Sequence, residues 1–343
     1  MFYTSNHSTA VGVGFGTAAL GGSCYNVVGV ALEAGFRKFD TAEADWWYDQ
    51  ASVGKALSHY FLQPTNEEED QTCVSANFCG KSCQIEDLRI STKIPPWSLT
   101  SFDDIRAHAA ASREELLGFC DEILITATDE NKGIMTEKSI PYPLDVYYIH
   151  APACWKGWHP RCDNPPPTLD LRSAWQAMEA VVGLDHSATR IGLSNVRPDE
   201  LLDIIQFAKQ RQESGDIQHE DPPPRKPDVV QAFADPIHPA DELRRICREH
   251  DIEFVSYSTL GTQHHSVSGN PVLGSPCIQS IANKHGRSTA EVVLSWALQN
   301  GMSVIPRSSN KNHIQQLARL LEENPGFLDN DDMQQIDSMK DTI

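Results

Sequence analysis

Four polar residues have the side-chain types needed to deliver a proton to a carbonyl oxygen: Asp40, Tyr48, Lys93 and His150. A tyrosine with the ordinary pKa of about 10 gives up its proton slowly at neutral pH, and a neighbouring ammonium group lowers that pKa. An aspartate keeps the lysine charged and oriented, and a neutral histidine can hydrogen-bond the substrate oxygen. If the fold brings these side chains together, they predict acid catalysis on a carbonyl group.

Each of these residues has a structural interpretation when it is considered alone. Asp40 suits the cap of a following helix, and Lys93 suits a surface lysine with a buried stem. His150 suits a core histidine, and Tyr48 suits aromatic packing beside two tryptophans. The catalytic interpretation therefore depends on whether the chain positions the four residues jointly.

Eight short β-branched runs, each ending at a polar residue or a glycine, alternate with helical patterns along the chain. The runs begin at Val11, Arg37, Leu88, Leu144, Thr189, Asp228, Ile252 and Met302. Such apolar strands need cover on both faces, and each intervening helix has one apolar face. The pattern predicts the α/β class, as an eight-stranded parallel (β/α)8 TIM barrel with extended loops. A doubly wound open sheet is the alternative fold.

We expect residues 1–343 to form a single barrel domain with insertions near residues 63–83, 127–143, 151–167, 213–226 and 261–276. The first, second and fourth insertions follow a helix and precede a strand, which would place them at the N-terminal face of a barrel. The other two follow strands, so we expect them to cover the C-terminal face, where such barrels carry their active sites.

The polar residues that end the eight runs would converge at that face. Besides Asp40, Lys93 and His150, they are Ser194, Asn195, Gln231, Tyr257, Ser258 and Arg307. Several of these have plainer interpretations, because Asn195 and Gln231 could satisfy buried backbone groups and Arg307 could be a surface cation.

Seven segments carry a wider resemblance: FDTAEADWWYDQASVGKAL, ISTK, DVYYIHAP, RIGLSN, VVQAF, FVSYSTLG and IPRSSNKNHI. In these segments and their order, the chain resembles the aldo-keto reductases over nearly its full length. The resemblance implies a catalytic tetrad of Asp40, Tyr48, Lys93 and His150, with NADP(H) as the cofactor. It further implies carboxamide contacts from Ser194, Asn195 and Gln231, ring stacking on Tyr257, a pyrophosphate loop with Ser258 and Leu260, and 2′-phosphate contacts from Arg307 and Ser308.

The turn after Asp40 departs from the family pattern. In the commonest spacing the tyrosine lies five residues after the aspartate, where this chain has Asp45, and the turn is longer than usual. Tyr48 is the only tyrosine between Asp40 and the following VGKAL helix, so it is the predicted acid.

The adenosine end of the predicted cofactor site departs as well. His313 stands where many family members place an arginine on the 2′-phosphate, and Leu317 stands where a polar adenine contact is common. A preference for NADP is therefore predicted mainly from Arg307 and Ser308. A guanidinium suits bidentate phosphate recognition, and the residues after it offer a helix N-terminus to the same anion.

The overall charge narrows the classes of partner. Lysine and arginine number 28 against 47 aspartates and glutamates, which gives 28 − 47 = −19. Such a charge repels nucleic-acid phosphates and anionic lipid heads, and the chain has no apolar run long enough to span a membrane. We expect a soluble cytoplasmic protein that binds neither nucleic acid nor membranes; the oligomeric state is not predicted.

The nine cysteines are odd in number and scattered, which is typical of reduced thiols rather than a disulfide framework. Cys73, Cys79 and Cys83 lack a paired C-x₂-C knuckle and an obvious fourth ligand, so no metal site is expected. The first strand is not followed by G-x-G-x-x-G, which argues against a Rossmann nucleotide-binding fold.

The predicted function is reversible hydride transfer between NADPH and the carbonyl of an aldehyde or ketone, with a tyrosine as the general acid. Trp46, Trp47 and Trp155, with Trp158 nearby, predict an aromatic wall for the substrate, whose identity is not predicted. The alternative is a regulatory subunit that senses nicotinamide nucleotides with little turnover, as the potassium-channel β-subunits of the family do. The lengthened turn and the large insertions keep that alternative open.

Overall fold

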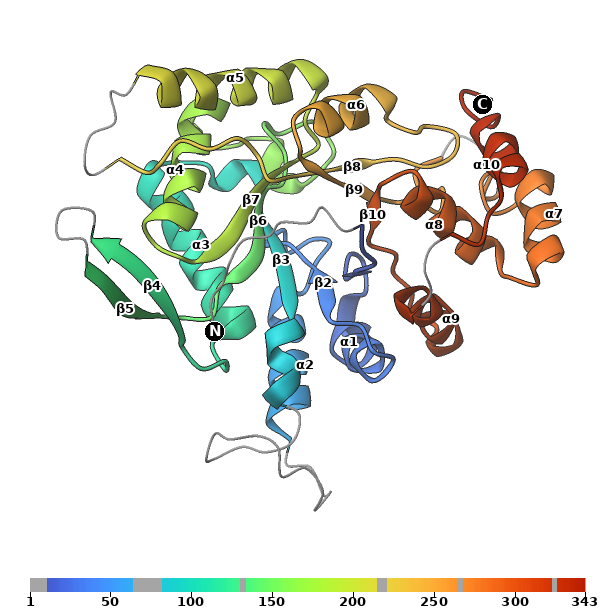
Figure 1. The fold of residues 1–343 in the computed structure, drawn as a ribbon, viewed down its shortest axis with the longest axis horizontal. Coiled ribbons are helices and arrows are strands. Elements are labelled where there is room, and N and C mark those ends of the chain that lie inside the picture. The colour runs from blue at the N-terminus through green and yellow to red at the C-terminus, as the bar shows by residue number, and fades with distance from the viewer. Residues whose placement is uncertain are drawn as a thin grey trace.

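A computed structural model describes residues 11–63, 82–129, 134–214, 221–264, 268–322 and 326–342 of the chain. Eight parallel strands form one sheet: β1 (Phe15–Gly16), β2 (Lys38–Asp40), β3 (Arg89–Ile94), β6 (Leu144–Ile149), β7 (Ala188–Ser194), β8 (Val229–Phe233), β9 (Glu253–Tyr257) and β10 (Ser303–Val304) (Figure 1). Each strand overlaps one of the eight predicted runs, and the order of the strands in the sheet is their order in the chain.

The sheet closes on itself where its first and last strands meet. Val13 pairs with Val304 in a parallel bridge. The backbone N–H of Gly14 donates to Val304 O at 2.8 Å, and the N–H of Val304 donates to Gly12 O at 3.0 Å. These bonds join the two edges, so the fold is the predicted (β/α)8 barrel and the open-sheet alternative is wrong.

A layer of helices surrounds the strands (Figure 1). The helices that follow successive barrel strands are α1 (Cys24–Glu33), α2 (Gln50–Leu62), α3 (Phe102–Leu117), α4 (Leu171–Gly183), α5 (Pro198–Ser214), α6 (Asp241–Glu249), α8 (Thr289–Gln299) and α9 (Lys311–Glu322). Consecutive helices from α1 to α6 pack against one another, and α9 contacts both α8 and α1. The outer layer therefore closes beside the same seam as the sheet.

Two helices and four short 3-10 turns lie outside the predicted alternation. Helix α7 (Pro276–His285) precedes α8, and α10 (Asn330–Asp337) packs on α7 near the C-terminus. The 3-10 turns are η1 (Gly21–Ser23), η2 (Ser82–Asp87), η3 (Pro96–Ser98) and η4 (Pro160–Cys162). Of these, η3 and η4 follow β3 and β6 and so help to shape the C-terminal end of the barrel.

The extra chain between α3 and β6 forms an antiparallel hairpin of β4 (Ile123–Asp129) and β5 (Ile134–Ile140), which projects from the barrel (Figure 1). The inserted segment thus begins at Ile123 rather than at the predicted residue 127, and it forms a pair of strands. Two β-branched runs on either side of a Lys-Gly pair in the sequence were the available signal. Residues 64–81 of the predicted insertion at 63–83 and residues 215–220 of the one at 213–226 lie outside the described residues.

An ionic cluster fills the N-terminal end of the barrel. Arg190 on β7 contacts Asp145 on β6 at 2.8 Å and Glu253 on β9 at 2.6 Å. Ser303 on β10 donates to the second Glu253 oxygen at 2.6 Å. One guanidinium thus binds both carboxylates, and with Ser303 the cluster ties four strands together.

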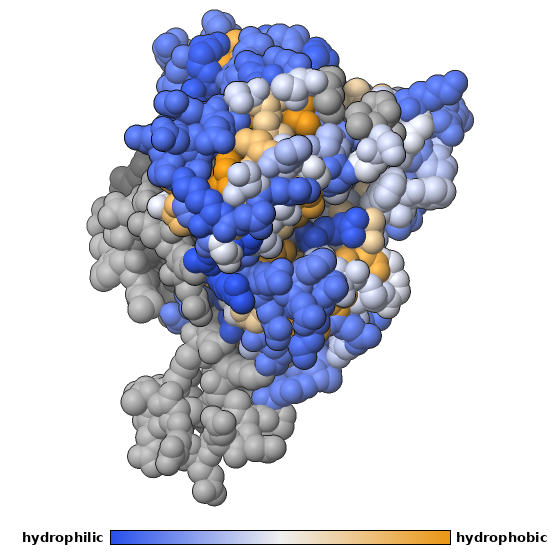
Figure 2. All heavy atoms as spheres, turned by 90° about the vertical axis from the view of Figure 1, so that its right-hand side faces the viewer, coloured by the Kyte–Doolittle hydropathy of each residue, from blue (hydrophilic) through white to orange (hydrophobic). Residues whose placement is uncertain are grey.

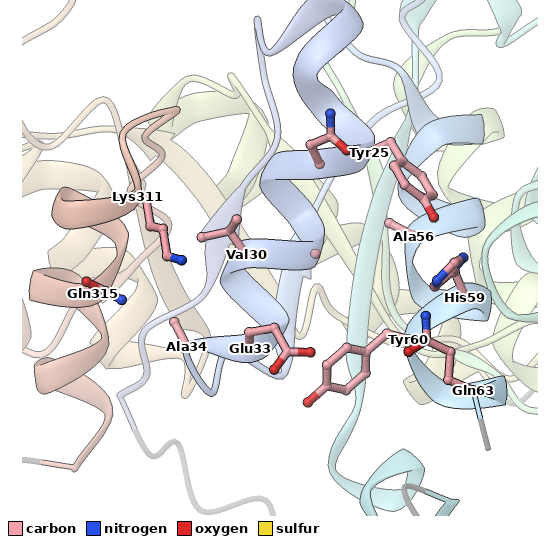
Figure 3. A pocket seen from close by; sticks show the side chains of 12 residues that line it. Tyr25, Val30, Glu33, Ala34, Ala56, His59, Tyr60, Gln63, Lys311 and Gln315 are labelled. Atoms are coloured by element: carbon pink, nitrogen blue, oxygen red, sulfur yellow. The ribbon is translucent and has the colours of Figure 1, made fainter. Parts of the chain in front are cut away.

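One face of the molecule is largely polar. Figure 2, which views the molecule from the right-hand side of Figure 1, shows a mainly hydrophilic face with hydrophobic residues in small recessed areas. A groove between α1, α2 and α9, with a volume of about 420 Å³, includes Tyr25, His59 and Lys311 in its lining (Figure 3). None of the predicted site residues lines it. In the part of the chain that the structure describes, no helix combines the length and apolarity needed to cross a membrane.

Two helical glycines provide a test of helix packing around the barrel. A Cβ at Gly54 in α2 would lie 2.1 Å from the carbonyl oxygen of Glu115 in α3, whereas a Cβ at Gly29 in α1 meets nothing within 4 Å. Replacing a helical glycine with alanine gains about 1 kcal/mol of helix propensity. At Gly54 we expect overpacking, which costs about 1–3 kcal/mol, to outweigh that gain.

Gly54→Ala should therefore lower the free energy of unfolding and Gly29→Ala should raise it, as measured by denaturant titration of both variants. A stabilised Gly54→Ala variant would contradict the close packing of α2 on α3.

Candidate active site

A buried ion pair lies at the C-terminal ends of β2 and β3. Lys93 Nζ donates to Asp40 Oδ1 at 2.5 Å and to the backbone oxygen of Thr41 at 2.8 Å. Lys93 is 1% exposed and Asp40 is 4% exposed. Burial lowers the pKa of Lys93 and the Asp40 carboxylate opposes that shift. The pair persists in the barrel because each charge compensates the other.

Tyr48 reaches this pair from the turn between β2 and α2. The backbone N–H groups of Trp47 and Tyr48 both donate to Ala44 O, at 3.1 and 3.0 Å. The added residues therefore coil into a tight turn, and Asp49 caps α2 by accepting from Ser52 N at 3.0 Å. This turn absorbs the extra length that the sequence showed after Asp40, so that Tyr48 can still face the strand ends.

The aromatic ring of Tyr48 lies between the other candidate residues. Lys93 Nζ is 5.3 Å from the ring centroid, and the His150 ring meets it edge-on at 5.8 Å between centroids. Among the described residues, no group hydrogen-bonds the Tyr48 hydroxyl. The structure thus brings Asp40, Tyr48, Lys93 and His150 together, as the sequence predicted.

His150 follows β6, and its backbone N–H donates to Ile94 O at 2.9 Å. Its side chain is buried, and burial together with the Lys93 charge places the pKa of His150 well below its usual value. Its Nδ1 atom has no hydrogen-bond partner among the described residues. The imidazole is therefore neutral at pH 7, and its Nδ1 atom is left to hydrogen-bond a bound molecule.

The electrostatics differ from the prediction in one respect. Lys93 was expected to lower the pKa of Tyr48, but burial and the Asp40 carboxylate raise the pKa of Tyr48 above its usual value. The reason is geometric, because the Lys93 ammonium lies over the ring rather than at the oxygen and is already paired with Asp40. Tyr48 therefore holds its proton firmly at neutral pH.

Gln231, at the centre of β8, has a different contact from the predicted one. Its Nε2 donates to Asp40 Oδ2 at 2.8 Å, so the two carboxylate oxygens bind Gln231 and Lys93 respectively. Sequence reasoning assigned Gln231 to the nicotinamide carboxamide and missed this bond. No sequence signal revealed it, because the partners are far apart in the chain and meet only across the closed barrel.

A second hydrogen-bonded group joins the ends of β6, β7 and β9. Tyr257 donates from its hydroxyl to Asn195 Oδ1 at 2.6 Å. Asn195 Nδ2 donates to His150 O at 2.9 Å and to Ser194 Oγ at 3.2 Å. Burial raises the pKa of Tyr257 to about 12, so its hydroxyl remains a donor. These contacts hold the predicted carboxamide and ring residues beside His150.

The β9 and β10 ends carry the remaining predicted cofactor residues. Ser258 has a left-handed backbone with φ of 53° and accepts from Gln263 Nε2 at 3.2 Å, while Leu260 packs against the core. After β10, Ser308 Oγ accepts from Asn310 N at 3.1 Å, and Asn310 Oδ1 accepts from His313 N at 3.4 Å.

Arg307 stands at the entrance to this turn with an exposed guanidinium. Within the described ranges it has no hydrogen bond or ion pair. An unpaired cation beside the first turn of α9 fits an anionic group. His313 lies in that first turn, where its backbone is already bonded to Asn310.

An aromatic wall adjoins Tyr48 and His150. Trp155 and Trp158 stack with ring centroids 4.4 Å apart, and Trp158 meets His150 edge-on at 5.0 Å. Trp97, in η3, stacks on His159 at 4.3 Å, and Trp46 meets His159 edge-on at 5.8 Å. Trp46 and Trp155, both predicted to contact substrate, therefore belong to one cluster with the catalytic candidates.

Two tryptophans differ from the sequence expectation. Trp47 is half exposed, and among the described residues its ring meets no other aromatic ring. Trp97 was not singled out, yet it is buried and its Nε1 atom has no partner in the described part of the chain. The Pro-Pro-Trp sequence directly after β3 was the available signal for it.

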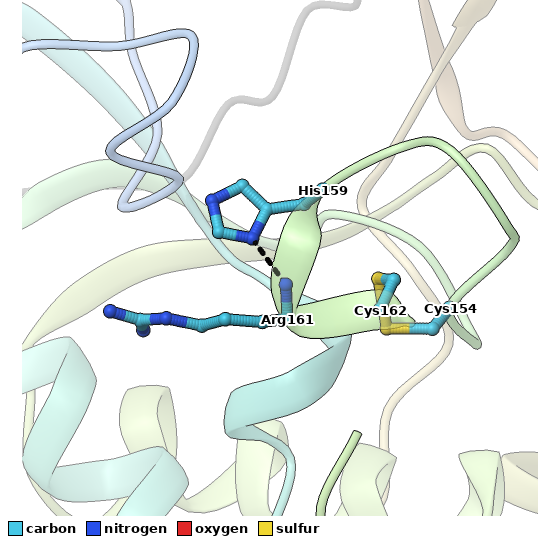
Figure 4. Close-up of a disulfide and its surroundings, with 4 residues drawn as sticks. All are labelled: Cys154, His159, Arg161 and Cys162. Atoms are coloured by element: carbon cyan, nitrogen blue, oxygen red, sulfur yellow. Dashed lines mark hydrogen bonds between the residues drawn. A yellow bond between two sulfur atoms is a disulfide. The ribbon is translucent and has the colours of Figure 1, made fainter. Parts of the chain in front are cut away.

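A disulfide between Cys154 and Cys162 holds the wall-forming loop after β6 (Figure 4). The expectation of reduced thiols is therefore wrong at these two positions, because the loop doubles back and brings the residues together. His159 lies inside the closed segment, and its Nδ1 accepts from Arg161 N at 3.1 Å. Both cysteines pack with Trp97 or its neighbours, so the crosslink supports the aromatic wall.

The lowered pKa of His150 predicts that this side chain does not titrate near neutrality. We expect the His150 ring resonances in an NMR titration to show no inflection near the ordinary histidine pKa of about 6.5, with a His150→Gln variant for assignment. The charged form appears only at lower pH, because burial and Lys93 both oppose it. An inflection near the ordinary histidine pKa of about 6.5 would contradict the buried, neutral imidazole.

Comparison with known proteins agrees with this geometry. The family model described as "Aldo/keto reductase family" matches residues 12–341. The D-galacturonate reductase of Fragaria ananassa is 33% identical over 83% of this chain and 72% of its own length. The glycerol 2-dehydrogenase (NADP(+)) of Hypocrea jecorina is 29% identical over 91% of this chain and 85% of its own.

Solved structures share the fold. An aldo-keto reductase of Bombyx mori, crystallised in complex with NADP, superposes with a TM-score of 0.68 at 20% identity, covering 96% of this chain and 89% of that one. The family match spans nearly the whole chain. The chain therefore belongs to the aldo/keto reductase family of oxidoreductases.

Proposed function

We propose that this protein reduces the carbonyl group of an aldehyde or ketone with NADPH, reversibly, using Tyr48 as the general acid. The observation that carries the proposal is the convergence of Asp40, Tyr48, Lys93 and His150 at adjoining strand ends. The family match supports the more general conclusion that the protein is an oxidoreductase with a nicotinamide cofactor. The identity of the acid, the preference for NADP and the direction of reaction are the proposal.

Tyr48 would hold the proton that the reduced substrate oxygen needs. Its raised pKa keeps it protonated before reaction, and its hydroxyl has no competing partner among the described residues. Charge that develops on the substrate oxygen makes transfer from Tyr48 favourable at that stage. Lys93 has three donors, of which the bonds to Asp40 and Thr41 use two, so one N–H is left to stabilise the tyrosinate that forms.

His150 and Gln231 would position these groups. The neutral imidazole of His150 can hydrogen-bond the substrate oxygen without adding a buried charge. Gln231 holds the second oxygen of Asp40, which fixes the carboxylate beneath Lys93. Gln231 would thereby act through Lys93 in addition to the predicted contact with the cofactor.

The protein's residues fit a nicotinamide dinucleotide, and when bound that cofactor supplies the hydride for the carbonyl carbon. Its proposed contacts are Ser194, Asn195, Gln231 and Tyr257 at the nicotinamide, Ser258 and Leu260 at the pyrophosphate, and Arg307, Ser308 and His313 at the adenosine end. The fit rests on the unpaired Arg307 guanidinium at the adenosine end and on the hydrogen-bonded side chains of Asn195 and Tyr257 at the other end.

The substrate class follows from the wall beside the acid. Trp46, Trp97, Trp155 and Trp158 present flat apolar faces, so an apolar or aromatic carbonyl compound would gain contact area there. The buried, unpartnered Nε1 of Trp97 offers one hydrogen bond to a polar substituent. We retain the cytoplasm as the proposed location and a small molecule as the proposed partner.

Removal of the Tyr48 hydroxyl tests the proposal. Tyr48→Phe should lower kcat/KM for an aromatic aldehyde by about 100- to 10,000-fold, because the proton donor is lost while the ring remains. The measurement is NADPH oxidation with purified protein, with NADPH binding followed by fluorescence. Binding should change little, and Tyr25→Phe in the outer groove is the matched control.

A fully active Tyr48→Phe variant would assign the acid to another residue. If the wild-type protein binds NADPH tightly and reduces no carbonyl in a broad panel, the regulatory-subunit alternative replaces the enzyme.

Removal of the Arg307 guanidinium tests the cofactor preference. Hydrogen bonds to charged groups contribute about 1.5–3 kcal/mol, so Arg307→Ala should weaken NADPH binding by roughly 10- to 150-fold. NADH binding should hardly change, because NADH lacks the 2′-phosphate. Arg319→Ala, further along α9, provides the matched control, and an equal loss for both nucleotides in Arg307→Ala would argue against 2′-phosphate recognition.

A further inference from the structure

We propose that Asp235, His238 and His264 form a binding site for a divalent transition-metal ion of the Zn²⁺ type. One ligand atom of each residue lies within 4.8 Å of the others. Asp235 and His238 belong to the loop after β8, and His264 belongs to the loop after β9. The sequence predicted no metal site, because these three residues come from two loops that only the folded barrel brings together.

The carboxylate of Asp235 is held in place before any ion binds. The backbone N–H of Asp235 donates to His238 O at 3.0 Å, which closes a tight turn. Asp235 Oδ1 accepts from the backbone N–H groups of Ile237 and His238, both at 2.8 Å. These backbone donors occupy Oδ1, which leaves Oδ2 for the contact with His264.

His264 provides the second ligand from the neighbouring loop. Its Nε2 lies 2.6 Å from Asp235 Oδ2, and the side chains of Asp235 and His264 are 0% and 6% exposed. Zn²⁺ binds imidazole nitrogen and carboxylate oxygen at about 2.0–2.2 Å, so these two atoms must separate by less than about 1 Å to share an ion. The Nε2 proton would pass to solvent as the nitrogen becomes a ligand.

His238 completes the set at the surface. Its ring centroid lies 5.3 Å from that of His264, at an interplanar angle of 36°. Phe233 packs near both rings, at 5.9 and 6.0 Å, and forms an apolar backing. Two imidazoles and one carboxylate suit Zn²⁺, and the exposed side of His238 leaves a fourth position open to water.

A bound ion would connect two loops at the C-terminal end of the barrel. Phe233 also lies 6.3 Å from Tyr257, so one aromatic ring separates the site from a proposed cofactor residue. The ion would fix the loop that carries His264 to the loop that carries Asp235. The metal site itself does not depend on the proposed catalytic function.

The test uses full-length protein freed of metal with a chelator and titrated with Co²⁺ and then Zn²⁺. We expect one equivalent of Co²⁺ to produce visible absorption bands typical of nitrogen and oxygen ligands, and Zn²⁺ to displace it. Mutation of a residue that only supports a metal ligand weakens metal binding by roughly 10- to 100-fold. His238→Ala removes a ligand itself, so it should weaken Co²⁺ binding by more than that. His59→Ala removes another exposed histidine and should leave binding unchanged.

His264→Gln provides a second variant, because it removes the other imidazole ligand from the opposite loop, and it should weaken Co²⁺ binding as His238→Ala does. The proposal would be overturned if wild-type protein bound no Co²⁺, or if His238→Ala bound it as tightly as wild-type protein. Near-ultraviolet bands from cysteine thiolates that persist in His238→Ala would also overturn it, because they would place the ion elsewhere.

Discussion

The hydrogen bonds that join β1 to β10 are the constraint on which the rest of this molecule depends. Across the seam, Val304 accepts from the backbone N–H of Gly14 and donates to the backbone oxygen of Gly12, and α9 covers the seam by packing between α8 and α1. In an open sheet, β2 and β8 would stand far apart. Closure brings Asp40 and Gln231 within hydrogen-bond distance across the barrel, so the site exists only because the last strand returns to the first.

Charge compensation shapes both ends of the barrel, with different results. At the N-terminal end, Arg190 forms ion pairs with two carboxylates, and this cluster has a structural role. At the C-terminal end, Asp40 is saturated by Lys93 and Gln231, but Lys93 and Tyr48 keep donors that the described residues do not use. These unused hydrogen-bond donors, next to a neutral His150, distinguish the candidate active site from the Arg190 cluster.

The loops after the strands add specificity to this common frame. The segment after β6 carries Trp155 and Trp158 and is crosslinked by the Cys154–Cys162 disulfide, so its aromatic wall is held beside the acid. The β4–β5 hairpin instead joins a helix to the start of a strand and extends from the barrel. Added chain therefore changes the substrate wall in one place and the outer shape in another, while the closed sheet stays the same.

The sequence by itself determined the eight strands, because a β-branched run that ends in a polar residue is a local sign of a buried strand. It thereby also placed Asp40, Lys93 and His150 at strand ends. Tyr48 also followed, as the only tyrosine in its turn. Only the tertiary structure decided the partners that lie far apart in the chain. These are the Gln231–Asp40 bond, the Trp97 stack, the Cys154–Cys162 crosslink and the grouping of Asp235 with His264. A local sequence pattern indicates which face of a helix or strand is buried, but it does not give the distance between two loops. That distance is set when the barrel closes.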